Sequence, residues 1–177
     1  MWRYNVKIIA IIIIILGLYT IYIYNKALQW DLKVSNSWSQ IGIQLKAKIS
    51  IIPNLVEVSK RYAIYEKDLF ISITEIRKKL INSESSNENI ENNSELNKSI
   101  EKLFGIAESY PELKANETFL DLQKQIREIE EKIAIYRQFY NDTVMLYNRF
   151  IQTFPHNIIV KFFVYKEVEY LKFDIND

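Results

Sequence analysis

The chain of 177 residues contains no cysteine, a single histidine, three glycines and three prolines. The absence of cysteine excludes disulfides, thiolate metal sites and cysteine nucleophiles. His156 has no histidine partner and no glutamate three residues before it, so the Glu-x-x-His pairs of di-iron bundles are missing. The isolated glycines form no phosphate-binding loop. We therefore predict no catalytic residue, no metal site and no cofactor, and we expect a protein that is not an enzyme.

Net charge is also nearly absent, because 23 Lys and Arg are matched by 22 Asp and Glu. A dedicated nucleic-acid-binding protein is clearly basic, so we expect no nucleic-acid partner. The charges are unevenly spread: residues 25–82 carry ten basic and five acidic residues, whereas residues 83–135 carry six and twelve. Opposite charges on two halves of one chain favour packing of the halves against each other. A juxtamembrane patch for anionic lipid is the alternative for the basic half.

The chain is rich in apolar residues at its N-terminus, where residues 8–24 read IIAIIIIILGLYTIYIY without a charge. As a helix this run would be about 26 Å long, close to the hydrocarbon thickness of a bilayer. We predict a short tail over residues 1–7 and one transmembrane helix over residues 8–24, which gives a single-pass protein of the cell membrane. A cleaved signal peptide is the alternative, but the run ends in bulky residues instead of small ones. Basic residues flank both ends almost equally, so the side of the membrane stays open.

Four amphipathic helices are expected beyond this run, because apolar residues recur at steps of three and four. We expect them to extend from the anchor to about Tyr62, from Tyr65 to Ile81, from Ser94 to Tyr110, and from Phe119 to Phe150. Pro53 should bend or restart the first helix, Pro111 should end the third and Pro155 the fourth. Residues 82–94, NSESSNENIENNS, are typical of a flexible loop by composition.

The last of these helices has the clearest pattern. Asn116 is a suitable N-cap. Its expected face has heptad spacing and comprises Leu122, Ile126, Ile129, Ile133, Tyr136, Tyr140, Thr143, Tyr147 and Phe150. We favour an internal bundle face over an exposed coiled coil that recruits a partner, because other amphipathic helices are present to cover it. The tail, residues 156–177, is expected to pack on or near the bundle, as a strand, an extended segment or a membrane-facing strip.

Two blocks of motifs resemble the LemA family of bacterial membrane proteins. The first block contains Trp38-Ser39-Gln40-Ile41, Gln44-Leu45-Lys46 and Ile52-Pro53-Asn54-Leu55-Val56-Glu57. The second contains Tyr110-Pro111-Glu112-Leu113-Lys114-Ala115-Asn116, Phe119-Leu120, Phe139-Tyr140-Asn141, Tyr147-Asn148 and Phe154-Pro155. The resemblance implies an all-α protein in which one N-terminal transmembrane helix precedes an antiparallel four-helix bundle, here residues 25–155. It also implies no established catalytic activity or cofactor.

Ten motif residues form our candidate structural or binding set: Trp38, Gln40, Pro53, Asn54, Tyr110, Pro111, Asn116, Tyr140, Asn141 and Asn148. We expect the Asn54 amide to satisfy backbone groups freed by Pro53. Tyr110, Pro111 and Asn116 suit a short connection between helices. Trp38 is expected in a core or interface. Asn141 and Asn148 share a helix face, where they would pair with the first long helix or line a small polar pocket.

We expect a membrane-anchored, non-enzymatic scaffold or adaptor at the bacterial cell envelope, with the bilayer and other envelope proteins as partners. The alternative is a ligand-binding sensory module with a polar pocket between the first and fourth helices. That alternative requires Asn54, Asn141 and Asn148 to converge.

Overall fold

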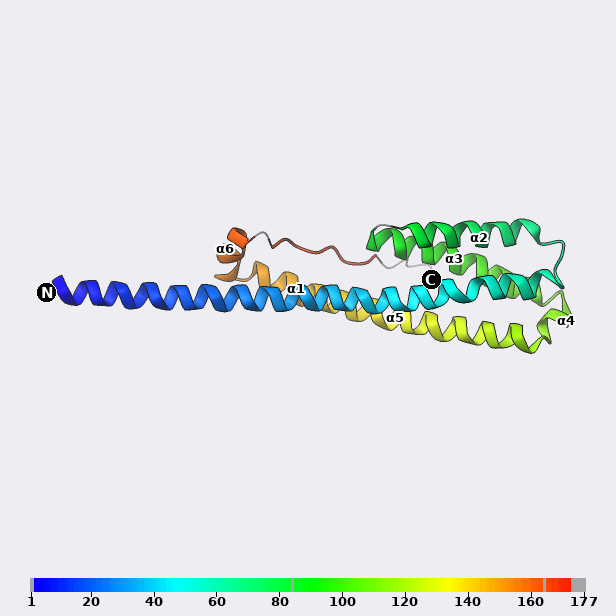
Figure 1. Cartoon of the computed structure of the whole chain (residues 1–177), viewed down its shortest axis with the longest axis horizontal. Coiled ribbons are helices and arrows are strands. Elements are labelled where there is room, and N and C mark those ends of the chain that lie inside the picture. Colours follow the sequence, from blue (N-terminus) through cyan, green and yellow to red (C-terminus); the bar gives the residue numbers. More distant parts are fainter. Residues whose placement is uncertain (1, 84, 164, 173–177) are drawn as a thin grey trace. The chain divides into compact units, whose positions relative to one another are not determined.

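The computed structural model describes residues 2–83, 85–163 and 165–172, and within these residues it is helical with no strand (Figure 1). The helices are α1 (Trp2–Lys60), α2 (Lys67–Asn82), α3 (Ser86–Ala107), α4 (Pro111–Lys114), α5 (Glu117–Gln152), α6 (His156–Val160) and the 3-10 helix η1 (Lys161–Phe163). The predicted all-α class is confirmed. The long N-terminal helix contains a strongly apolar segment that is long enough to cross a membrane.

The chain divides into two compact units, which are described separately. Unit 1 contains the described residues of 1–37 and 139–170, and unit 2 contains those of 38–138 and 171–177. Helices α1 and α5 each contribute residues to both units.

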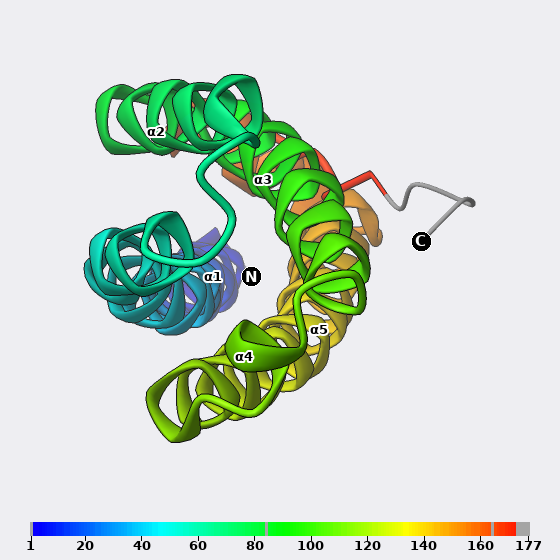
Figure 2. The same cartoon turned by 90° about the vertical axis from the view of Figure 1, so that its right-hand side faces the viewer.

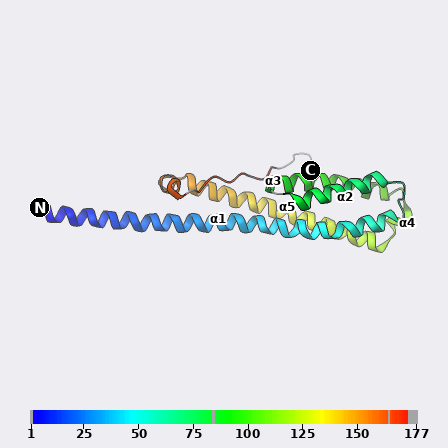
Figure 3. The same ribbon diagram turned by 45° about the horizontal axis from the view of Figure 1, so that its top comes forward.

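The core of unit 2 is built from one apolar face of each long helix. Helices α2 and α3 lie side by side (Figures 1 and 3), and the short α4 lies at the turn between α3 and α5 (Figure 2). Almost fully buried members of this core include Leu55, Phe70, Ile73, Leu103 and Phe119. Because burying one such side chain contributes about 1.5–3 kcal/mol, this cluster is the main stabilising element of the unit.

Helix α1 continues through Pro53 without a new start, so the predicted restart is wrong. Proline has no N–H, and the carbonyl of Ile49, four residues earlier, therefore loses its helical donor. The Nε of Arg77 in α2 donates a 2.9 Å hydrogen bond to this carbonyl oxygen. Asn54, which we expected to fill this role, is exposed. A neighbouring helix thus supplies the missing donor where α1 continues through the proline.

The predicted flexible loop over residues 82–94 is also wrong for most of its length. Helix α2 ends at Asn82 and α3 begins at Ser86, eight residues before the expected start. The Ser85 hydroxyl accepts a 3.1 Å hydrogen bond from the Glu88 N–H, a typical N-cap. Ile90 and Asn93 are buried, so packing in unit 2 overrides the low helix propensity of this polar segment.

Helix α5 confirms the fourth expected helix and its N-cap. The Asn116 Oδ1 accepts a 2.9 Å hydrogen bond from the Phe119 N–H. Most of the predicted heptad face is buried, namely Leu122, Ile126, Ile129 and Ile133 in unit 2 and Tyr140, Thr143 and Tyr147 in unit 1. Tyr136 and Phe150 are half-buried. This burial favours an internal face over an exposed one.

In unit 1, the apolar run of α1 has almost no protein cover. Every residue from Ile8 to Leu18 is exposed, and burial begins at Ile23 and Ala27. The tail is helical through α6 and η1 and then continues without regular structure over residues 165–172. Of the three forms expected for the tail, these residues show an irregular segment that is partly packed, and not a strand. Residues 173–177 lie outside the described part of the chain.

Candidate functional site

The most unusual group in unit 2 is Lys48, a completely buried lysine on α1. Its Nζ lies 2.6 Å from Oε1 of Glu130 on α5 and donates a 2.8 Å hydrogen bond to Oδ1 of Asn93 on α3. It also donates to Asn97, whose amide donates a 2.7 Å hydrogen bond to Glu130 Oε2. A buried ammonium is tolerated only when it is paired and hydrogen-bonded. Two other helices, α3 and α5, satisfy that requirement here.

Burial lowers the pKa of Lys48 from its ordinary value, because removal from water disfavours the charged form. The Glu130 carboxylate opposes this shift through its charge and its hydrogen bond, but desolvation is the larger effect. Glu130 keeps 28 % of its side chain exposed, so the network connects a buried ammonium to the surface of the unit.

Our sequence reasoning missed this network, although a signal for it exists. Lys48 lies three residues after Leu45 and four before Ile52, in phase with the buried stripe of α1. A lysine at a stripe position, with an Asn93-x-x-x-Asn97 pair elsewhere, predicts a buried polar contact between helices. The composition of residues 82–94 predicts a loop at Asn93, and a loop residue gives no indication of a contact with Lys48.

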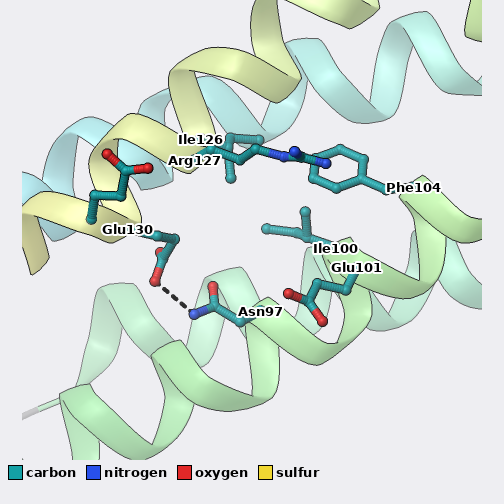
Figure 4. Close-up of a pocket in the computed structure, with 8 residues that line it drawn as sticks. Asn97, Ile100, Glu101, Phe104, Ile126, Arg127 and Glu130 are labelled. Atoms are coloured by element: carbon teal, nitrogen blue, oxygen red, sulfur yellow. Dashed lines mark hydrogen bonds between the residues drawn. The ribbon is translucent and has the colours of Figure 1, made fainter. Parts of the chain in front are cut away.

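Beside this network, a groove of about 520 Å³ runs between α3 and α5 (Figure 4). Its lining residues are Asn97, Ile100, Glu101, Phe104, Ile126, Arg127, Glu130 and Glu131. Figure 4 shows Arg127 extending along the groove toward Phe104, while Asn97 and Glu130 are joined by their hydrogen bond. The groove therefore combines an apolar floor with carboxylates at its rim, a combination that suits a ligand or side chain with an apolar part and a positive charge.

One end of unit 2 is tied by two of the predicted motif residues. The Asn116 amide donates a 3.2 Å hydrogen bond to the Tyr62 hydroxyl, and the Tyr110 hydroxyl lies 3.5 Å from Glu66 Oε1. Pro111 is the first residue of α4, where its missing N–H costs nothing. The Tyr110, Pro111 and Asn116 motif thus fixes a helix connection, as expected, and links it to the turn between α1 and α2.

In unit 1, Asn148 and Tyr147 hold the tail against α5. The Asn148 amide donates a 2.8 Å hydrogen bond to the carbonyl of Val168, and its oxygen accepts a 2.9 Å hydrogen bond from the Val168 N–H. The Tyr147 hydroxyl donates to the Lys166 carbonyl at 2.9 Å. Burial, assisted by the Asp31 carboxylate, raises the pKa of Tyr147 to about 12, so the phenol remains a donor at neutral pH. Asn148 binds backbone and does not pair with the first long helix.

The other predicted residues do not form a common site. Asn54 and Pro53 are exposed, whereas Trp38, Gln40 and Asn141 are half-buried and Tyr140 is buried. With Asn54 exposed and the Asn148 amide fully engaged by Val168, the expected three-amide pocket lacks two of its groups. His156 lies 3.1 Å from the Phe150 carbonyl through its Nδ1 and stacks on the Phe150 ring. Among the described residues, no cluster of three His, Cys, Asp or Glu is placed to hold a metal ion.

Over its described residues, the protein is all-helical, with one long apolar N-terminal helix and a core to which α1, α2, α3, α4 and α5 contribute. The chain belongs to the LemA family, whose family model matches residues 37–177. This match confirms the resemblance seen in the Trp38 and Tyr110 motif blocks. A comparison with curated proteins finds no significant match.

Proposed function

We propose that this LemA-family chain is a single-pass membrane protein whose residues 8–24 anchor an antiparallel four-helix bundle, and that the bundle is a non-enzymatic scaffold or adaptor at the bacterial cell envelope. The observation that carries this proposal is the uncovered apolar run from Ile8 to Leu18. Water would impose a large penalty on so many exposed isoleucines, whereas a bilayer accepts them.

Continuity of α1 favours a retained anchor over a cleaved signal peptide. The helix runs from Trp2 to Lys60 and carries both the apolar run and core residues of unit 2. Cleavage near Tyr24 would cut inside this helix. The retained helix would place the bundle directly at the membrane surface, where its partners would be lipids and other envelope proteins.

The groove between α3 and α5 is the surface that we assign to a protein partner. Glu101 and Glu131 are exposed at its rim, and the half-buried Phe104 offers an apolar contact. A partner segment with a basic residue beside an apolar one would complement both features. This mode of binding requires no reaction and no cofactor.

Site-specific photo-crosslinking in intact bacterial cells tests the scaffold role. A crosslinking residue at position 131 should give a discrete protein adduct, and the charge reversal Glu101→Lys should abolish it. A crosslinker at Lys132, which is exposed but does not line the groove, is the matched control and should give no such adduct. If positions 131 and 132 behave alike, or the charge reversal changes nothing, the assignment of the groove is wrong.

A further inference from the structure

The tail of unit 1 carries a second exposed apolar surface next to the end of the N-terminal run. Phe154, Ile158 and Phe162 are 75 %, 52 % and 81 % exposed, and they recur at intervals of four residues from the turn before α6 through α6 and η1. The same segment buries Val160, so it has an inner and an outer apolar side. Large aromatic residues exposed in this way mark an interaction surface.

Contacts within unit 1 fix where this segment lies along α1. The Phe163 ring packs on the Tyr24 ring with centroids 5.1 Å apart, and the Tyr165 ring lies 6.2 Å from Tyr24. Tyr24 is the last residue of the uncharged run. If residues 8–24 span the hydrocarbon, Tyr24 lies at the boundary between acyl chains and headgroups, and α6 and η1 lie at that boundary too.

We propose that residues 154–163 form a membrane-interface wedge, in which Phe154, Ile158 and Phe162 insert into the lipid interface beside the transmembrane helix. Aromatic rings favour this region of a bilayer. Lys161 is exposed next to Phe162 and is placed to meet lipid phosphates. The wedge gives unit 1 two contacts with one membrane, and it rests on the membrane anchoring proposed above.

This arrangement has a mechanical consequence. A single transmembrane helix leaves the attached domain free to tilt and rotate, whereas a second contact beside it restricts both motions. The paired hydrogen bonds of Asn148 keep residues 165–168 on α5. This attachment would transmit the restraint from the inserted segment to α5.

Nitroxide labelling of the full chain in vesicles of phosphatidylcholine and phosphatidylglycerol tests the wedge, and the lack of native cysteine makes single-cysteine variants direct. Labels go to position 162 in the wedge, position 12 in the run and position 132 in the bundle. Frequent collision of the nitroxide with oxygen indicates a lipid environment, and frequent collision with a water-soluble nickel chelate indicates an aqueous one. We expect the labels at positions 12 and 162 to report lipid, with the label at 162 at a shallower depth in the bilayer. We expect the label at position 132 to report water.

The three labels separate the two proposals. If the label at position 12 reports lipid and the label at position 162 reports water, the wedge is wrong and the membrane anchor stands. If the label at position 12 reports water, both the anchor and the wedge are wrong. A label at 162 that is shielded from both reagents indicates a protein contact and also overturns the wedge. In a second experiment, a label at position 161 should change from lipid to water when Phe154, Ile158 and Phe162 are all replaced by serine. No change there would contradict the wedge.

Discussion

Arg77 Nε lies 2.9 Å from the carbonyl oxygen of Ile49, the one backbone acceptor that Pro53 deprives of its helical donor. The contact explains how a proline is accommodated inside α1, and it joins α1 to α2 at that point. It also makes the proline and the arginine energetically dependent on each other, which leads to a first prediction.

The substitution Arg77→Met should lower the free energy of unfolding by about 1–2 kcal/mol, because the part-buried Ile49 carbonyl loses the donor that replaces its helical one. In a Pro53→Ala background the same substitution should cost clearly less, since the alanine N–H restores the helical hydrogen bond to Ile49. Chemical unfolding of the full chain in detergent micelles, followed by circular dichroism, measures both values.

Arg61→Met is the matched control, because Arg61 forms an exposed pair with Glu57 and should contribute little. Equal costs of Arg77→Met in the two backgrounds would show that the arginine acts independently of the proline.

The Lys48 network should respond asymmetrically to removal of its two charges. Glu130→Gln leaves a buried ammonium without an anion and should cost about 3 kcal/mol or more. Lys48→Met should cost less, because methionine suits the apolar stripe and Glu130 can turn toward water. The double variant should be no less stable than Glu130→Gln alone. The same unfolding experiment shows which variant loses more free energy of unfolding. A larger loss for Lys48→Met than for Glu130→Gln would contradict our description of the network.

The lowered pKa of Lys48 predicts a pH dependence of stability with a definite sign. Between the lowered pKa and the ordinary value of 10.5, the unfolded chain binds a proton that the folded chain does not. The free energy of unfolding therefore rises with pH in this window. Wild type should gain stability relative to Lys48→Met as the pH approaches 10.5. Using the difference between the two proteins removes the tyrosines that titrate in the same range. A difference that is flat or falls with pH would refute the shift.

Asn148 should control the attachment of the tail. Asn148→Leu removes both hydrogen bonds to Val168 and should abolish protection of its amide from hydrogen exchange. Asn148→Asp keeps the acceptor for the Val168 N–H and loses only the donor, so it should retain part of the protection. Met145→Ala, at an exposed position of the same helix, should leave the tail unchanged. Full protection of Val168 in the leucine variant would show that other contacts hold this segment.

The sequence predicted the helices where apolar periodicity was strong, and it failed where polar residues are packed. The face of α5 and the Asn116 cap follow from local spacing, and the structure confirms them. The start of α3 could not be found in this way, because Asn92 and Asn93 have the composition of a loop. Their partners, Ser83 for Asn92 and Lys48 for Asn93, are brought to them only by folding. Arg77 was missed for the same reason, since its acceptor is 28 residues away in the chain.

In the candidate site, too, local features could be predicted and contacts made by tertiary packing could not. The Asn116 cap acts on the nearby Phe119 N–H and could be predicted, whereas the hydrogen bonds from Asn116 to Tyr62 and from Tyr110 to Glu66 join distant residues and could not. The sequence predicts that Asn54 satisfies the backbone groups freed by Pro53, and that Asn148 pairs with the first long helix or lines a polar pocket. The Ile49 carbonyl receives its donor from Arg77 on another helix, and the Asn148 amide bonds Val168 in the tail, so both contacts depend on tertiary packing.

The central claim, that residues 8–24 are a retained membrane anchor, is tested most directly by alkaline carbonate extraction of bacterial membranes followed by intact-mass measurement. Carbonate removes peripheral proteins and leaves those with a spanning helix. We predict that the chain stays in the membrane pellet with a mass that includes the apolar run. Release into the supernatant, or a mass shortened by the loss of residues 8–24, would contradict the account.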